Sequence, residues 1–431
     1  MRKTLLLALC SFPAFALASG YSLPNVNPRD LSLAAAAVAA QGDSGAALAM
    51  PAALARQSGL SVRLGSSLLN LFDVWSDPTG AAPDEEIDRR FTPLPALSAS
   101  YGGKIAALGD RGWGVGLGLE PFGGGAVFWP DGWEGRYRVL TVDQKVIRTA
   151  LSAGIEVLPM LRVGGGVVYY YTLEKLSQNF CVTCAGFVGP DATGTLELQG
   201  GAVAFDVSAE LDVPGVPLRI AVDYKHQAAQ TLKGDLRWTG IPAPLAADPQ
   251  GALLRDQDAQ HVVTVPNTLN VGIAYRVARP LQVMFTYTFD RWEVYREDLF
   301  VGSEPGATLA VERNYGNGHT IRAGAEYDLN PRLQLRVGVQ RDISGLDTGT
   351  YSPTLPDASS WAVTAGAGYR FGRGFSVDAG LFYAFMDEVT STDNGSEPSL
   401  GSPEPTGTFR GTYDVAALIY GVSIGWSPGA R

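Results

Sequence analysis

Residues 265–297 constrain the fold more than any other stretch, because apolar residues there alternate with polar or small ones. Over 269–277 one parity reads Leu, Val, Ile, Tyr, Val and the other reads Asn, Gly, Ala, Arg; the alternation resumes over 281–290 after a short break. A period of two predicts a β-hairpin whose two faces meet different surroundings. Each arm is as long as the roughly 9 to 11 residues that a tilted strand needs to cross a bilayer. The pattern leaves open whether the apolar face meets a protein core or lipid.

Residues 1–18 have the order of a secretory signal peptide. Arg2 and Lys3 precede an apolar run over 5–17, and the small residues at its end predict cleavage before Ser19. Cys10 lacks the small preceding residue that lipid attachment favours, so we do not expect a lipid anchor there. No later stretch reaches the roughly 18 consecutive apolar residues of a transmembrane helix. Any crossing of a membrane must therefore be made by strands.

Charge and cysteine content narrow the partners and cofactors. The formal charge is −10, and loss of Arg2 and Lys3 makes it −12 (−10 − 2). An acidic balance argues against nucleic acid as a partner. Only Cys181 and Cys184 follow the predicted cleavage site. In an exported protein this spacing predicts a small disulfide loop rather than a zinc site, which needs more Cys or His ligands, so we expect no metal and no other cofactor.

Residues 19–58 differ in character from everything after them. An alanine-rich run over 31–40 has helical propensity, the Gly-Asp-Ser-Gly stretch at 42–45 interrupts it, and few large apolar side chains occur anywhere in the segment. Such a segment would not fold alone, but it could fill a polar cavity formed by the rest of the chain. A disordered tail is the alternative interpretation.

Residues 59–431 contain about fourteen strand candidates separated by alternately short and long breaks. The short breaks fall at 109–110, 158–160, 214–215, 278–280, 330–331 and 372–373, and the long ones at 71–93, 122–135, 176–196, 232–260, 296–317, 343–358 and 388–411. This alternation places all long loops on one side, as in outer-membrane barrels. The sequence therefore predicts an all-β fold, a transmembrane antiparallel β-barrel over 59–431 with residues 19–58 as a partly helical hatch inside it.

The parity of charged residues agrees with a barrel. Charges in the strand middles share a parity with Gly, Ser and Ala: Arg63, Lys104, Glu120, Glu156, Arg162, Asp206, Glu210, Arg219, Asp223, Arg276, Arg322, Glu326, Arg336 and Asp378. An Arg or Lys facing lipid at mid-bilayer costs about 2 to 4 kcal/mol, and an inward orientation removes that cost. A soluble sandwich would show the same parity, but the strand count, the signal peptide and clustered aromatic residues favour the barrel. Those aromatic residues, expected in an interfacial girdle, are Tyr169, Tyr170, Tyr171, Tyr287, Phe289, Trp292 and Tyr295.

Four stretches in register resemble the FadL family of outer-membrane transporters for long-chain fatty acids and other hydrophobic compounds, which includes aromatic-hydrocarbon uptake channels. The stretches are NPRDLSLAAAAVAAQGDSGAALAMPAAL at 27–54, the segment 112–139, the hairpin 265–297 and the segment 355–388. The resemblance implies a fourteen-stranded barrel in the bacterial outer membrane, among its lipid and lipopolysaccharide. It also implies capture of ligand by external loops, a pocket above the hatch and passive sideways release beside a kink in the third strand. A single barrel is the expected oligomeric state.

In this sequence the kink is expected around Glu120, Pro121, Gly123 and Gly124. Proline removes a donor from the ladder, and the glycines after it let the backbone bend. These residues are the candidates for the lateral gate. The alternative is that Pro121 merely ends the strand at the edge of the membrane.

The chain departs from the family pattern at two places. Where the family typically has Asn-Pro-Ala-Gly-Leu at the end of the hatch, this chain has Met50 followed by Pro51, Ala52, Ala53 and Leu54. An anchoring contact from the asparagine is therefore not expected. Residues 427–431 also follow the alternating last strand, where the family usually stops.

Candidate ligand-binding residues lie near 122–135 and 176–188, predicted loops that carry apolar groups: Phe122, Phe128, Trp129, Trp133, Leu176, Phe180, Phe187 and Val188. Apolar patches on exposed segments often bind something, although these groups could instead pack the loops against each other. A fatty carboxylate would also need a cation, for which Arg136, Arg148 and Lys175 are candidates. An aromatic hydrocarbon would need none.

Two other classes of function remain as alternatives. An outer-membrane hydrolase would need a histidine beside a serine and an orienting polar group, and nothing marks such a trio around His226, His261 or His319, which we expect to be solvated near strand ends. The glycines at 112, 114, 116 and 118 lie in a strand pattern and do not open a helix, so they do not predict a nucleotide loop. A surface barrel with an adhesive or structural role is the other alternative; it predicts that deleting the hatch leaves uptake unchanged.

Overall fold

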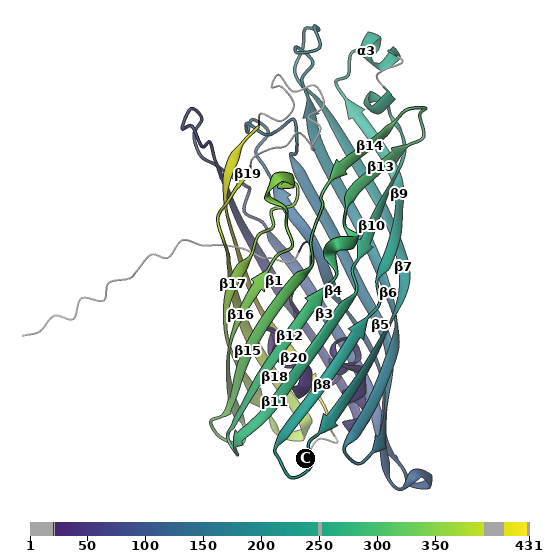
Figure 1. Ribbon diagram of the computed structural model, residues 1–431, viewed down its shortest axis with the longest axis vertical. Helices are drawn as coiled ribbons and strands as arrows, with labels where there is room; N and C mark the ends of the chain where they lie inside the picture. The colour runs from purple at the N-terminus through teal and green to yellow at the C-terminus, as the bar shows by residue number, and fades with distance from the viewer. Residues whose placement is uncertain (1–19, 21, 249–251, 392–408, 429–431) are drawn as a thin grey trace, which may run out of the picture.

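The computed structural model describes residue 20 and residues 22–248, 252–391 and 409–428. The predicted signal peptide and its cleavage site lie outside these residues. Within them the chain forms a closed antiparallel β-barrel of 14 strands, as predicted (Figure 1). The first and last strands close the barrel, with Val62 opposite Trp426 and Ser76 opposite Thr412. No helix in the described ranges is both long and apolar enough to span a membrane.

The strands of the barrel differ in continuity. Uninterrupted strands are β1 (Gly59–Ser76), β3 (Phe91–Ile105), β4 (Arg111–Phe128), β5 (Thr141–Leu158), β6 (Leu161–Phe180), β7 (Ala192–Asp212), β16 (Leu333–Ile343), β17 (Ser360–Arg370), β18 (Phe375–Met386) and β20 (Gly411–Trp426). Four strands are broken into two pieces, a lower one near the tight turns and an upper one near the long connections (Figure 1). They are β8 (Leu218–Lys225) with β9 (Ala228–Thr239), β11 (Thr268–Ala278) with β10 (Gln257–Val265), β12 (Leu281–Asp290) with β13 (Glu297–Gly302), and β15 (Gly318–Asp328) with β14 (Thr308–Glu312), the lower piece given first in each pair.

Short elements occupy the loops. They are β2 (Glu85–Glu86), β19 (Val389–Ser391), α3 (Ala243–Ala247), η3 (Ala106–Leu108), η4 (Ala252–Leu254), η5 (Trp292–Val294), η6 (Thr348–Thr350) and η7 (Gly372–Gly374). The long connections gather at one end of the barrel and the tight turns at the other (Figure 1). This arrangement confirms the alternation of short and long breaks.

The apolar parity of the lower strands faces away from the lumen. Ile273 and Phe285 are 40% and 41% exposed although they lie in the middle of paired strands, and Val277 near the end of β11 is 53% exposed. The hairpin predicted at 265–297 is formed by β11 and β12, with Val271 opposite Tyr287. Apolar side chains that stay exposed all around a closed barrel form the surface that lipid covers.

Charged side chains of the lower strands mostly face the lumen, as predicted. Buried members of the predicted set are Arg63, Glu120, Arg162, Asp206, Glu210, Asp223, Glu326, Arg336 and Asp378. Lys104 and Arg276 are exposed to solvent but keep the inward parity, because Lys104 lies opposite Gly112, which faces the hatch, and Arg276 alternates with the buried Ala274. Each lies within two residues of a strand end at a tight turn, where its long side chain reaches water.

The upper strands extend beyond the apolar band. The exposed face of β9 carries Thr231, Lys233, Asp235 and Arg237 in place of the apolar residues that β8 exposes. A lipid-facing strand would not present this series of polar groups. The part of the barrel made by β9, β10, β13 and β14 therefore lies outside the membrane-spanning segments.

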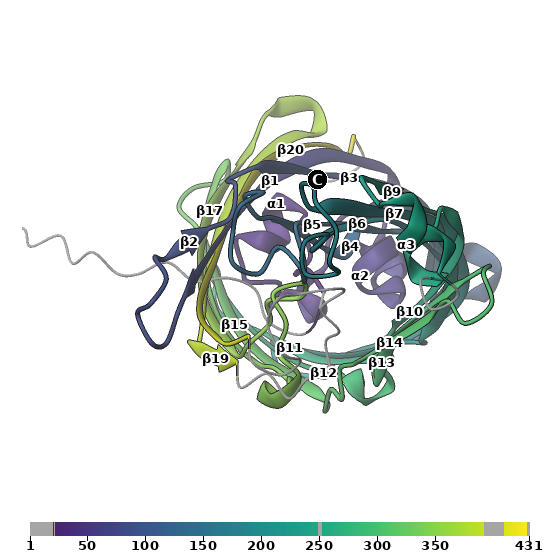
Figure 2. The same ribbon diagram turned by 90° about the horizontal axis from the view of Figure 1, so that it is seen from above.

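The hatch lies inside the barrel (Figure 2), in its lower half (Figure 1). It contains α1 (Pro28–Leu31), η1 (Val38–Ala40), α2 (Ala46–Ala49) and η2 (Pro51–Arg56), and β1 begins at Gly59 directly after it. Most of its apolar residues are alanines, and nearly all of its apolar residues are buried against the barrel wall. The disordered-tail alternative is wrong for the described part of this segment, because the wall supplies the core that the segment lacks by itself.

Glycines of the wall let the hatch approach the strands closely. A Cβ added at Gly112, Gly114 or Gly164 would collide with hatch backbone atoms of residues 51–55. On the opposite wall, a Cβ at Gly338 or Gly380 would collide with hatch backbone at residues 33–34 and 28. The glycine run at 112–118 thus lies within β4, as its pattern predicted. It forms a flat surface against which the hatch packs, called here the hatch seat.

Two sequence predictions about the upper barrel need correction. Tyr170, Trp292 and Tyr295 were expected in an interfacial girdle, but they are only 1%, 0% and 8% exposed and point into the lumen. Tyr170 has the inward parity of Thr172 on the same strand, and η5 turns Trp292 inward. The predicted loops at 122–135 and 176–196 are also shorter than expected, because pairing between β4, β5 and β6 continues well above the apolar band.

Candidate functional site

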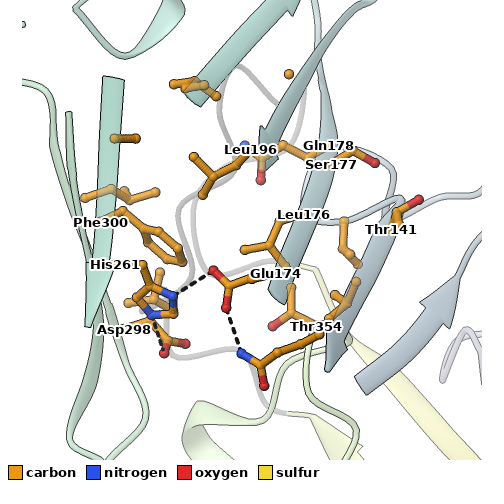
Figure 3. Close-up of a pocket in the computed structure, with 18 of the residues that line it drawn as sticks. Thr141, Glu174, Leu176, Ser177, Gln178, Leu196, His261, Asp298, Phe300 and Thr354 are labelled. Atoms are coloured by element: carbon orange, nitrogen blue, oxygen red, sulfur yellow. Dashed lines mark hydrogen bonds and ion pairs between the residues drawn. The ribbon is translucent and has the colours of Figure 1, made fainter. Parts of the chain in front are cut away.

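A large cavity lies inside the upper part of the barrel (Figure 3). It encloses about 1340 Å³, part of which is open to solvent. Leu176 of β6, Leu196 of β7 and Phe300 of β13 line it, together with Val142 and Val263. Strand alternation places these side chains inward from five different strands. We call this space the upper cavity; its wall is mainly apolar.

A chain of charged side chains crosses one wall of the upper cavity (Figure 3). The Nδ1 atom of His261 lies 2.8 Å from Glu174 Oε1, and its Nε2 atom lies 3.1 Å from Asp298 Oδ1. His261 also stacks on Phe300, with ring centres 4.2 Å apart. All three charged residues are at most 6% exposed. The imidazole is thus held between two carboxylates on β6 and β13.

Further donors complete this charged cluster. Arg313 Nε lies 2.7 Å from Asp298 Oδ2, and the hydroxyl of Tyr295 donates to Asp298 at 2.8 Å. Gln144 Nε2 donates to Glu174 Oε2 at 2.7 Å. Every carboxylate oxygen of the cluster therefore accepts at least one hydrogen bond or ion pair. A cluster in which every oxygen is bonded in this way fixes the strands relative to each other.

The cluster keeps His261 protonated. Burial lowers the pKa of His261, but Glu174 and Asp298 outweigh burial and raise it to about 10. Burial raises the pKa of Asp298, whereas Arg313 and His261 lower it further, so the net direction is down. Because both ring nitrogens of His261 already contact carboxylates, the imidazole has no free nitrogen to act as a general base.

A second, more polar space lies between the hatch and the wall, and we call it the lower cavity. It encloses about 780 Å³, part of it open to solvent. Hatch residues Val38 and Leu48 line one side, and Pro121 and Phe122 of β4 line another. Its ionisable lining residues are three acids and three bases: Asp30, Glu120, Asp290, Arg148, Lys225 and Arg322. The ring of Phe122 packs edge-to-face with the ring of Tyr170, with ring centres 5.3 Å apart.

The wall beside the lower cavity has a gap in its hydrogen-bond ladder. β3 and β4 are paired from Ile105 opposite Arg111 only as far as Leu97 opposite Leu119. Above that point β3 continues along β1, and β4 continues along β5 with a register shift between Pro121 and Gly123. The irregularity lies where the sequence predicted a kink. Since β4 extends to Phe128, the alternative that Pro121 ends the strand is wrong.

The start of the described chain occupies this gap from inside. Ser22 forms an isolated bridge with Gly123, and the amide of Leu23 donates to the carbonyl of Phe122 at 2.9 Å. Gly20 has a separate contact, in which its amide donates a hydrogen bond to Asp357 Oδ2 at 2.9 Å. The segment 22–25, named here the N-terminal strap, thus satisfies the Phe122 carbonyl of β4 where β3 no longer pairs.

Only two of the predicted apolar ligand residues line these cavities, Leu176 the upper and Phe122 the lower. Trp129 and Trp133 stack on each other 4.0 Å apart in a buried cluster with Trp75 and Phe409. Phe180 and Phe187 pack with Trp238 in another cluster. These side chains follow the alternative in which they pack the loops together.

The predicted cations are already paired. Arg136 contacts Asp191, and the exposed Lys175 contacts Glu197. Arg148 lines the lower cavity but forms an ion pair with Glu120. Phe128, another apolar candidate, lines neither cavity; the guanidinium of Arg90 lies over its ring, 3.8 Å from the ring centre.

Sequence reasoning missed the charged cluster of the upper cavity. His261 was expected to be solvated, and that prediction is wrong because its side chain is 3% exposed. One local signal existed, since His261 shares a parity with Ala259, Val263 and Val265, all buried. Its partner Glu174 is 87 residues away in the chain, which no local pattern reveals.

The remaining predicted features lie away from the cavities or within the hatch. Cys181 and Cys184 form a disulfide with Cα atoms 5.3 Å apart. Pro51, Ala52 and Leu54 are buried in η2, where the amide of Ala52 donates to Ser208 Oγ at 2.8 Å. No group of three or more potential metal ligands occurs among the residues that the structure describes.

Comparison with known proteins gives concordant results. The family described as outer membrane protein transport protein (OMPP1/FadL/TodX) matches residues 9–427. The long-chain fatty acid transport protein of Escherichia coli K12 is 24% identical over 171 residues, 39% of this chain and 37% of that protein. The curated relatives are matched over less than half of their own length.

Two solved structures share the fold. A FadL homologue of Pseudomonas aeruginosa has a TM-score of 0.82 at 19% identity, covering 95% of this chain and 100% of that one. The toluene transporter TodX of P. putida has a TM-score of 0.67 at 14% identity, covering 90% and 95%. At these identities the likeness is one of fold alone.

Proposed function

The chain belongs to the OMPP1/FadL/TodX family of outer membrane transport proteins, and from that premise we propose that it carries hydrophobic small molecules passively across the outer membrane. Ligand enters the upper cavity from the external side, moves to the lower cavity beside the hatch, and leaves sideways through the wall between β3 and β4. The route avoids the polar lumen below, which the hatch fills. Long-chain fatty acids and aromatic hydrocarbons are the two candidate substrate classes.

The gap between β3 and β4 above Leu119 carries this proposal. The pairing of β3 with β4 stops there, and Pro121 and Phe122 beside the break line the lower cavity. The outer face of the neighbouring wall is apolar, with Leu97, Leu117 and Leu119 exposed. A hydrophobic molecule leaving there would pass directly from the protein into the hydrocarbon of the membrane.

The N-terminal strap gives the gap a movable cover. Its described contact to β4 is one isolated bridge, in which the amide of Leu23 donates to the carbonyl of Phe122, a small fraction of what a full strand would form. A hydrogen bond contributes only about 0.5–1.5 kcal/mol net, so a ligand can displace the strap from β4 at a small cost in free energy. We propose that the strap leaves β4 when ligand passes, and that a single barrel without catalytic activity is the functional unit.

Uptake measurements test the proposal. Labelled toluene and a labelled long-chain fatty acid are given to cells that lack their own transporter and express the wild-type chain, a deletion of 123–125 at the gap, or a deletion of the exposed residues 78–80. Equal insertion is checked by surface labelling. We expect the gap deletion to reduce uptake at least tenfold and the control deletion to leave it unchanged. Equal uptake by the two deletions would exclude lateral release at this gap, and no uptake by an inserted wild-type barrel would exclude transport of both compounds.

A further inference from the structure

The charges that line both cavities bear on the substrate class, and the following inference rests on the function proposed above. A fatty acid is ionised at neutral pH, so a site that takes it out of water must offer a cation whose charge is not already used. A hydrocarbon, alcohol or ester has no such requirement. The two cavities can therefore be compared by asking which charges remain uncompensated.

The charges of the upper cavity largely neutralise each other. His261 and Arg313 contribute two positive charges, and Glu174 and Asp298 contribute two negative ones, all within one contact network. A ligand carboxylate approaching His261 would also approach Glu174 and Asp298, which repel it. The fifth charged lining residue, Arg138, is 6% exposed and places its guanidinium 5.1 Å from the ring centre of Phe409.

The lower cavity is balanced as well. Its three acids and three bases sum to zero, and the bases have partners within the protein. Arg148 pairs with Glu120, and Lys225 pairs with Asp223. Arg322 donates to Thr288 and Gln340. A carboxylate beside Arg148 or Lys225 would have to break an ion pair, and one beside Arg322 would also approach Asp290, which repels it. An uncharged molecule leaves these contacts intact.

We propose that the ligand of this transporter is an uncharged hydrophobic compound, and that its two cavities discriminate against the ionised carboxylate of a fatty acid. The apolar wall of Leu176, Leu196 and Phe300 supplies affinity through burial. The saturated cluster of His261 holds the strands in place and presents no spare charge. Discrimination comes from the cost of leaving a buried carboxylate without a partner cation.

Matched probe pairs test this inference on the full barrel in lipid nanodiscs. Trp238 lines the upper cavity, so ligand binding is followed by tryptophan fluorescence with a Trp238→Phe variant as the blank. Toluene is compared with benzoate, and decanol with decanoate, at pH 7.5. We expect the neutral member of each pair to bind at least about tenfold more tightly. Equal or tighter binding of the carboxylates would overturn the proposal.

Two variants sharpen the test. Glu174→Gln removes one acid from the balanced cluster. The ratio of the carboxylate's dissociation constant to that of its neutral partner should therefore fall at least threefold. An unchanged ratio in a folded barrel would count against the charge argument. Arg138→Gln is measured alongside, and a tenfold loss of carboxylate affinity there would reveal a ligand-binding cation and overturn the proposal. Failure of all four probes to bind would instead overturn the proposed function itself.

Discussion

The hatch level and the upper cavity use opposite means to hold the same barrel together. At the hatch, small side chains and glycines bring backbone against backbone, as where Gly114 faces Leu54. In the upper cavity, long charged side chains span the space, as in the chain Glu174–His261–Asp298. The first arrangement fills the lumen and the second keeps part of it open. Close packing suits a plug, and walls fixed at a distance suit the ligand chamber that we propose for the upper cavity.

The largest effect should follow loss of the shared carboxylate in the upper cavity. Asp298→Ala leaves His261 and Arg313 facing each other without the acid between them, and breaking such a buried pair costs about 3–5 kcal/mol. We expect hydrogen exchange in β10 and β13 to accelerate accordingly, while exchange in β4 stays slow. Glu197→Ala is the control, because its pair with Lys175 is exposed and contributes less than about 1 kcal/mol. Similar acceleration in both variants would mean that the cluster does not fix these strands.

The corresponding change at the hatch level is steric. Gly114→Val places a side chain against the backbone carbonyl of Leu54, which cannot rotate away, and overpacking of this kind costs about 1–3 kcal/mol. The hatch should shift, and single-channel conductance in planar bilayers should rise. Gly103→Val is the matched control, because a Cβ there meets only Trp113 at 3.7 Å. Unchanged conductance in the Gly114 variant would show that the hatch has more freedom than its packing implies.

The two levels also differ in how far the sequence predicts them. The period of two in 265–297 and the parity of charges predict the barrel, because each is a local pattern repeated along the chain. The glycine run at 112–118 is visible in the sequence, but its role as a seat depends on the hatch, some 60 residues earlier. His261 gives only a parity signal, and its partners Glu174 and Asp298 lie 87 and 37 residues away. Ligand candidates chosen for apolarity alone mostly pack loops, since burial and ligand contact favour the same side chains.

A reversible change of intermediate size should come from raising the pH, which acts on the upper cavity through His261. The pKa of His261 is raised from 6.5 to about 10, so its contribution to stability is complete below about pH 6.5 and is lost as the pH rises towards 10. The neutral imidazole can still donate one hydrogen bond, so the loss should be smaller than in Asp298→Ala. Exchange in β10 should therefore quicken between pH 7 and 10, after correction for the intrinsic pH dependence of exchange. His261→Gln should remove this dependence, and its persistence in that variant would assign it to another group.

The smallest effect should come from the hatch level, where one side-chain hydrogen bond supplements the packing. The Oγ atom of Ser208 on β7 accepts from the buried amide of Ala52 at 2.8 Å. Ser208→Ala leaves that amide unpaired and should cost about 1 kcal/mol, which amounts to roughly fivefold faster exchange of the Ala52 amide. Ser66→Ala is the control, because Ser66 Oγ donates only to the neighbouring Ser67 carbonyl at 3.4 Å. If Ser208→Ala also raised conductance as Gly114→Val does, the hatch would depend on polar contacts as much as the upper cavity does, and the contrast between the two levels would fail.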